Sequence, residues 1–146
     1  MGRILSIDYG KKRIGIAVTD ELQIMANGLT TVGVDDFFLF LKMYNQTENV
    51  ELFLVGEPKQ MNYTNSSVSK DIEEFIKKLQ KEFPNIPIKR VDERFTSKMA
   101  FQTMIDAGLN RKKRQNKALV DTISATIMLQ SYLESREYIL TKEKNT

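Results

Sequence analysis

The 146-residue chain contains no cysteine, no histidine and no tryptophan. Without cysteine there can be no disulfide bond, thiolate nucleophile, zinc finger or iron–sulfur site. Without histidine there is no imidazole base, which excludes Ser-His-Asp and Cys-His catalysis. Any metal ion must therefore be held by oxygen ligands, which favour Mg²⁺, Mn²⁺ or Ca²⁺.

Long apolar runs are also absent. The apolar stretches are far shorter than the ~20 residues of a membrane span, and Asp8 interrupts the N-terminal segment before a signal-peptide core can form. We therefore expect a cytoplasmic protein with no membrane contact. The length, with 41% hydrophobic and 28% charged residues, suits one globular domain over residues 1–146.

The formal charge of +3 is only mildly basic, but the basic residues are clustered. A short cluster contains Lys12 and Arg13, and a longer one without acidic residues contains Arg111, Lys112, Lys113, Arg114 and Lys117. Such clusters neutralise phosphates and accelerate association with nucleic acid. A solvated loop has the same composition, so charge alone does not decide between the two interpretations.

The hydropathy pattern predicts a three-stranded meander followed by alternating helices and strands. The predicted strands are Arg3–Asp8, Arg13–Thr19, Ile24–Val32, Glu51–Gly56 and an edge strand Ile86–Val91. The predicted helices are Asp35–Thr47, Ile72–Phe83, Thr96–Ala107 and Asn116–Glu134, and Glu57–Ser69 is expected to be a loop. This order predicts an α/β fold with a five-stranded mixed sheet, three antiparallel strands and then parallel ones, flanked by helices. Right-handed crossovers would place the fourth strand beside the first, which matches the ribonuclease H-like architecture.

Acidic residues stand where two predicted strands end. Asp8 ends the first strand, and Glu93 follows the last one. A carboxylate at the centre of a sheet is costly to desolvate unless it is paired or binds a cation. Two structural alternatives are open: Asp8 begins a turn, and Asp92 or Glu93 pairs with Arg94 or with the positive end of the next helix.

Asp121 lies inside an otherwise apolar helix. An exposed ion pair with Lys117, one turn earlier, would contribute only ~0.3–0.5 kcal/mol. The small residues Ser124 and Ala125 instead allow a close approach to the sheet, so we expect Asp121 to face it. Three converging carboxylates repel one another, and divalent cations relieve that repulsion. Two such ions about 3.5–4 Å apart can activate water and stabilise the leaving oxygen of a phosphodiester.

Four motifs occur in order along nearly the whole chain. They are Asp8-Tyr9-Gly10-Lys11-Lys12-Arg13-Ile14-Gly15-Ile16-Ala17, Val55-Gly56-Glu57-Pro58, Asp92-Glu93-Arg94-Phe95-Thr96-Ser97 with Ala100, and Lys117-Ala118-Leu119-Val120-Asp121 with Ser124-Ala125. Together they resemble the YqgF/RuvX family, ribonuclease H-like proteins related to Holliday junction resolvases.

The resemblance implies a nuclease that acts on structured nucleic acid with Mg²⁺ or Mn²⁺ in a two-metal site. Family members are described as pre-16S rRNA nucleases with a role at the 5′ end of that RNA, in ribosome biogenesis, and also as Holliday junction resolvases. Carried over by motif, the catalytic and metal-binding carboxylates would be Asp8, Glu93 and Asp121. The residues that would hold phosphate or order these carboxylates are Arg13, Arg94 and Lys117.

The second motif departs from the family pattern. The family usually has an apolar residue after the glycine and an asparagine before the methionine, where this chain has Glu57 and Gln60. Related resolvases place an acidic ligand after this strand. We therefore carry two interpretations: Glu57 supplements or competes with Glu93, or it is an exposed loop glutamate. Asp92 is a further candidate for the same metal site.

Other functions fit parts of the sequence. A non-catalytic nucleic-acid-binding factor in rRNA maturation or transcription would keep the basic segment Arg111–Lys117 and tolerate loss of the carboxylates. Sugar kinases and actin-like ATPases share the Asp-x-Gly strand–turn but need a second domain and a second phosphate loop. The sequence does not decide whether the substrate is RNA or junction DNA. The ribosome or its precursors are possible partners, and the protein is either a monomer or a homodimer. Tyr9, Tyr63 and Phe95 either stack on bases or lie in the core.

Overall fold

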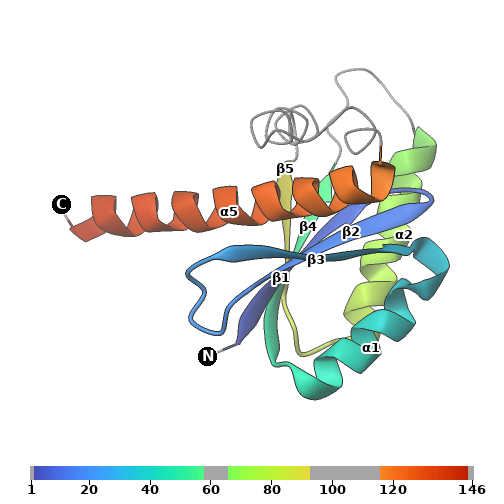
Figure 1. The fold of residues 1–146 in the computed structure, drawn as a ribbon, viewed down its shortest axis with the longest axis horizontal. Coiled ribbons are helices and arrows are strands. Elements are labelled where there is room, and N and C mark those ends of the chain that lie inside the picture. Colours follow the sequence, from blue (N-terminus) through green and yellow to red (C-terminus); the bar gives the residue numbers. More distant parts are fainter. Residues whose placement is uncertain (1, 58–65, 93–115, 145–146) are drawn as a thin grey trace.

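The computed structural model describes residues 2–57, 66–92 and 116–144. A five-stranded mixed sheet forms its centre, in the order β3-β2-β1-β4-β5 (Figure 1). Its strands are β1 (Arg3–Tyr9), β2 (Arg13–Thr19), β3 (Ala26–Gly33), β4 (Val50–Glu57) and β5 (Ile88–Asp92). The first three pair antiparallel, and β4 and β5 continue parallel to β1. The mixed sheet, the placement of β4 beside β1 and the edge position of β5 confirm the predictions.

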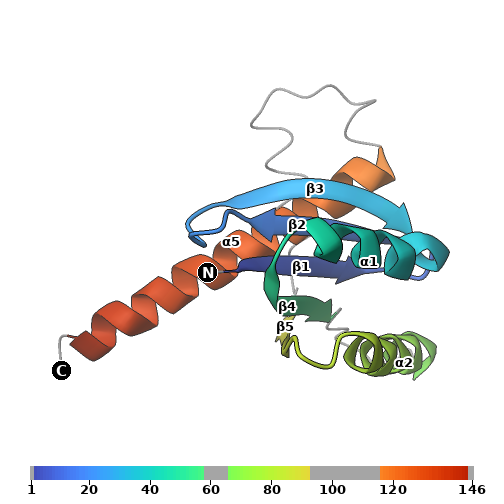
Figure 2. The same ribbon diagram turned by 90° about the horizontal axis from the view of Figure 1, so that it is seen from below.

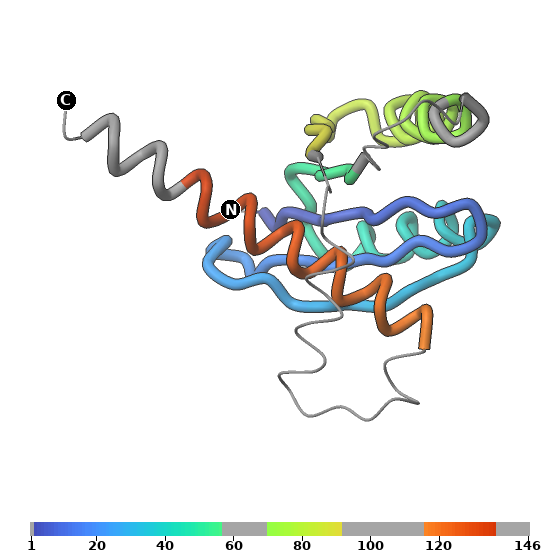
Figure 3. Tube along the Cα trace, turned by 90° about the horizontal axis from the view of Figure 1, so that it is seen from above, coloured from blue at the N-terminus to red at the C-terminus, as the bar shows by residue number. Residues whose placement is uncertain are grey.

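Helices cover both faces of the sheet (Figure 2). The short 3-10 helix η1 (Val34–Asp36) leads into α1 (Phe37–Thr47), and α1 and α2 (Ser66–Glu82) pack on one face. The long helix α5 (Lys117–Lys144) crosses the other face obliquely, beginning near the end of the sheet where β1 turns into β2 (Figure 3). Within the described ranges, no helix is long and apolar enough to cross a membrane.

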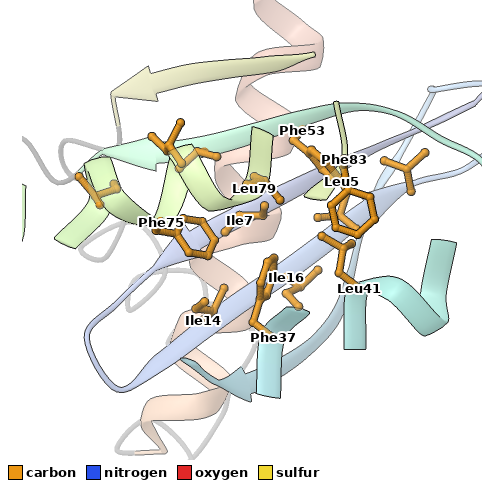
Figure 4. Close-up of a cluster of buried hydrophobic side chains, with 14 of the residues drawn as sticks. Leu5, Ile7, Ile14, Ile16, Phe37, Leu41, Phe53, Phe75, Leu79 and Phe83 are labelled. Atoms are coloured by element: carbon orange, nitrogen blue, oxygen red, sulfur yellow. The ribbon is translucent and has the colours of Figure 1, made fainter. Parts of the chain in front are cut away.

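Strand alternation divides the core into two layers. Leu5 and Ile7 of β1 and Ile14 and Ile16 of β2 face α1 and α2, where they meet a cluster that includes Phe37, Phe75 and Leu79 (Figure 4). On the other face, buried side chains of the strands pack under α5: they include Ile4, Ala17 and Leu54, against Ala125, Leu129 and Leu133. Each fully buried Leu, Ile or Phe contributes about 1.5–3 kcal/mol to folding. The core therefore fixes which face of the sheet each strand residue presents.

Element boundaries differ from the predictions where polar residues hide the periodicity. The loop expected up to Ser69 is wrong at its end, because α2 already begins at Ser66 with a polar first turn. The last helix continues past Glu134 to Lys144, through a charged stretch without an apolar period. β5 begins at Ile88 instead of Ile86, because Pro87 has no N–H to donate to the sheet. Only the Pro87 carbonyl oxygen takes part, and it accepts a hydrogen bond from the Phe53 N–H at 3.0 Å. The helix predicted over Thr96–Ala107 lies outside the described residues.

Candidate active site

Asp8 lies near the end of the central strand, on the face covered by α5. Two residues earlier on the same face, the Ser6 hydroxyl donates a hydrogen bond to the Ala125 carbonyl of α5 at 3.0 Å. Asp8 itself is partly buried, and its register partners are Gly15 on β2 and Gly56 on β4. Both register partners are glycines, so the positions directly opposite Asp8 on β2 and β4 carry no side chain.

The backbone of α5 approaches the sheet very closely at Gly15. A Cβ atom built on Gly15 would lie 2.2 Å from the Asp121 carbonyl oxygen and 3.1 Å from the Asp121 Cβ. Helix and strand can approach this closely only because residue 15 has no side chain. The contact confirms that Asp121 faces the sheet. Since Gly15 is the register partner of Asp8, the structure brings two of the three predicted carboxylates to one place on one face.

Arg13 holds the Asp121 side chain. The Arg13 Nε and Asp121 Oδ2 atoms are 2.6 Å apart, and the side chains are 36% and 23% exposed. Arg13 begins β2 two residues before Gly15, so alternation directs its side chain to the α5 face. This long-range pair takes the place of the local pair with Lys117. A pair at this exposure contributes only ~0.2–1 kcal/mol to stability, so its main effect is to orient the carboxylate.

Hydroxyl groups of β1 and β3 anchor α5 around Asp121. Besides the bond from Ser6, the Thr31 hydroxyl on β3 donates to the Ala118 carbonyl at 2.7 Å and lies 2.5 Å from the Thr122 hydroxyl. The hydropathy pattern does not predict these anchors. Ser6, which is 0% exposed, has one signal in the sequence, because it is a polar residue inside an apolar strand. Thr31 carried none, because threonine is common in strands.

Of the remaining predicted site residues, two lie within the described ranges. Lys12 and Lys117 are exposed, in the β1–β2 turn and at the first turn of α5. The residues that lie outside the described ranges are Glu93, Arg94, Arg111, Lys112, Lys113 and Arg114. Within residues 2–57, 66–92 and 116–144, no three acidic residues form a metal-binding group.

The structure also places the further candidates for metal binding and base stacking that lie within the described ranges. Gly56 is the register partner of Asp8, whereas Glu57 pairs with Asp92 at the ends of β4 and β5. Tyr9 faces away from Asp8: its ring lies 4.8 Å from that of Phe75 in the opposite core layer. Of the two alternatives for Tyr9, the structure favours packing against the core. Tyr63 and Phe95 lie outside the described ranges.

Comparison with known proteins gives one consistent result. The RuvX family model, described as Holliday junction resolvase, matches residues 2–135. A protein of Flavobacterium psychrophilum named "Putative pre-16S rRNA nuclease" is 62% identical over 133 residues, which cover 91% of this chain and 97% of that protein. One of the same name from Phocaeicola vulgatus is 59% identical over 139 residues, covering 95% and 100%.

The fold is similar to that of two solved RuvC structures. The structure of T. thermophilus RuvC in complex with Holliday junction substrate has a TM-score of 0.57 and 16% identity, covering 94% of this chain and 96% of that one. A structure of Thermus thermophilus RuvC has a TM-score of 0.55 and 14% identity, covering 92% and 96%. These similarities confirm the ribonuclease H-like fold.

Proposed function

Because this chain belongs to the RuvX family, we propose that it is a metal-dependent nuclease that hydrolyses phosphodiester bonds. We propose pre-16S rRNA as its substrate. The observation that carries this proposal is the approach of α5 to Gly15, which brings Asp121 next to the register partner of Asp8. The names of the relatives favour precursor ribosomal RNA. Such a substrate would place the protein in the cytoplasm, with ribosome precursors.

The residues at this position fit Mg²⁺ or Mn²⁺. Carboxylate oxygens are the ligands these ions prefer, and Asp8 and Asp121 bring two carboxylates to the same face of the sheet. A carboxylate has about four lone-pair sites on two oxygens, so Asp121 can accept from Arg13 and still bind a cation. From the sequence, we propose Glu93 as the third ligand. A pair of bound ions would supply an activated water and stabilise the leaving oxygen.

The protein's own groups have three tasks in this proposal. Asp8, Asp121 and Glu93 would hold the cations, and Arg13 would keep Asp121 in one orientation. Lys12 and Lys117, exposed near the same end of the sheet, would attract and position the phosphate backbone. The basic residues outside the described ranges would extend this surface: Arg94, Arg111, Lys112, Lys113 and Arg114.

A cleavage panel tests the proposal. Wild type and Asp121→Asn are incubated in Mn²⁺ and in EDTA with a precursor 16S rRNA fragment, an unstructured RNA of equal length and a four-way DNA junction. We expect wild type to cleave the precursor fragment only in Mn²⁺, and Asp121→Asn to lose this activity because the amide removes an anionic ligand.

Two other outcomes have distinct meanings. The family description favours junction resolution as a second function, and preferential cleavage of the four-way junction would select it over rRNA processing. A homodimer would suit such a two-fold substrate. Binding of the rRNA fragment in EDTA without cleavage of any substrate in Mn²⁺ would instead contradict the nuclease and indicate a non-catalytic factor.

Replacing Arg13 tests whether this residue orients the Asp121 carboxylate or mainly stabilises the fold. We expect Arg13→Gln to lower cleavage about 10–100-fold, as for other partners of metal ligands, while stability changes by ~1 kcal/mol or less. Arg13→Lys should recover only part of the rate, because an ammonium lacks the planar guanidinium fork. Cleavage rates across Mn²⁺ concentrations and urea unfolding measure both effects.

The matched control is Arg136→Gln. Arg136 bonds to the Gln23 side chain at 2.8 Å, farther along α5 from Asp121. The Arg136→Gln substitution should leave cleavage unchanged. If both variants reduce cleavage equally, Arg13 has no specific role in orienting Asp121.

A further inference from the structure

A cleft of about 320 Å³ lies on the face of the sheet opposite Asp121. Its walls come from the end of β1, from η1 and α1, and from α2. Aromatic rings and carboxylates make up most of its lining: Tyr9, Phe38, Phe75, Asp35, Asp71 and Glu74. This volume is at the lower end of the range for ligand sites, so it suits a single side chain better than a large molecule.

The aromatic side of the cleft already holds one cation. The Phe75 ring, which Figure 4 shows over β1, lies 4.8 Å from the Tyr9 ring and 5.6 Å from the Phe38 ring. The Lys78 Nζ atom lies 4.5 Å from the Phe38 ring centroid. The negative faces of aromatic rings attract ammonium and guanidinium groups, and such contacts strengthen when water is excluded.

The charge of the lining is also suited to a cation. Three carboxylates face one ammonium, that of Lys78. Across the described part of the chain, no lysine or arginine pairs with Asp35, Asp71 or Glu74. Burial, together with the charges of Asp71 and Glu74, raises the pKa of the Tyr9 hydroxyl, so the negative potential of these carboxylates extends to the aromatic side.

We propose that this cleft binds a lysine or arginine side chain of a basic protein segment. The carboxylates would pair with its charge while the rings contact its alkyl stem or guanidinium plane. The same carboxylates repel phosphate, which disfavours nucleic acid as the occupant. Because the cleft and the Asp8–Asp121 site lie on opposite faces of the sheet, a protein partner and a nucleic acid can be bound together. Binding of such a segment does not depend on nuclease activity.

NMR titration of the ¹⁵N-labelled full chain tests this proposal. The probes are the tripeptides acetyl-Gly-Arg-Gly-amide and acetyl-Gly-Lys-Gly-amide, and a citrulline tripeptide that keeps the shape of arginine without its charge. We expect saturable shifts of Tyr9, Phe38 and Phe75 with the two cationic peptides. The citrulline peptide should bind about tenfold more weakly or not at all.

A pair of double variants isolates the role of the carboxylates. Asp71→Asn with Glu74→Gln should weaken binding of the arginine peptide about five- to tenfold and leave RNA cleavage unchanged. Glu21→Gln with Glu134→Gln removes the same charge from the β2–β3 turn and α5, away from the cleft, and should bind like wild type. Both spectra must show a folded protein.

Four results would overturn the proposal. They are equal binding of the arginine and citrulline peptides, equal behaviour of the two double variants, no saturable shift at the cleft with any peptide, and shifts there with a short single-stranded RNA but not with the cationic peptides. The last result would make the cleft a nucleotide site.

Discussion

Replacing Asp8 by asparagine should lower metal-dependent cleavage about 10³-fold without unfolding the protein. The substitution keeps the shape of the side chain but removes a negative charge between the glycines of β2 and β4. A loss of this size corresponds to several kcal/mol of transition-state stabilisation, as expected when a metal ligand is removed. Single-turnover cleavage in saturating Mn²⁺ measures the effect.

The stability of Asp8→Asn distinguishes a functional residue from a structural one. Asp8 is partly buried, and asparagine keeps the size and shape of its side chain. We expect the melting temperature of Asp8→Asn to stay within a few degrees of that of wild type, because no cavity or overpacking is created. Asp36→Asn, an exposed aspartate at the start of α1, is the matched control and should cleave normally. Full-rate cleavage by Asp8→Asn would contradict the proposed mechanism.

Replacing Gly15 by alanine should both destabilise the protein and abolish most of its activity. The added Cβ would lie 2.2 Å from the Asp121 carbonyl oxygen, and backbone atoms of a packed helix cannot move alone. The helix would have to retreat by about 1 Å, and overpacking of this kind costs about 1–3 kcal/mol. The retreat would also move Asp121 away from Asp8. Urea unfolding and cleavage by the folded variant measure the two effects.

Gly33→Ala provides a matched control. Gly33 has φ −66°, which alanine adopts without strain, and its nearest contact to an added Cβ would be 3.4 Å, to the Asp36 Oδ2 atom. Here alanine should be neutral or stabilise by about 0.4–1 kcal/mol, because it restricts the unfolded chain. Equal stability and activity of Gly15→Ala and Gly33→Ala would show that α5 adjusts freely at Gly15.

Local patterns in the sequence predicted much of the architecture. Alternation over Arg13–Thr19 placed Gly15 and Ala17 on the face opposite Ile14 and Ile16, as the two core layers confirm. The small residues Ser124 and Ala125 predicted the close approach of the last helix. The patterns failed at the start of α2 and the end of α5, where polar and charged residues carry no apolar period.

By itself, the sequence excluded cysteine and histidine chemistry, predicted the order of the strands and supplied the motifs of the family. Only the tertiary structure decided which groups meet. Arg13, 108 residues away, is the partner of Asp121 in place of Lys117, and the hydroxyls of Ser6 and Thr31 hold α5. The cleft likewise joins three segments whose acidic residues, taken alone, are typical of solvated helix surfaces. The hydrophobic period of a segment shows which face of that helix or strand is buried. Contacts between distant segments depend instead on how the helices and the sheet pack in three dimensions.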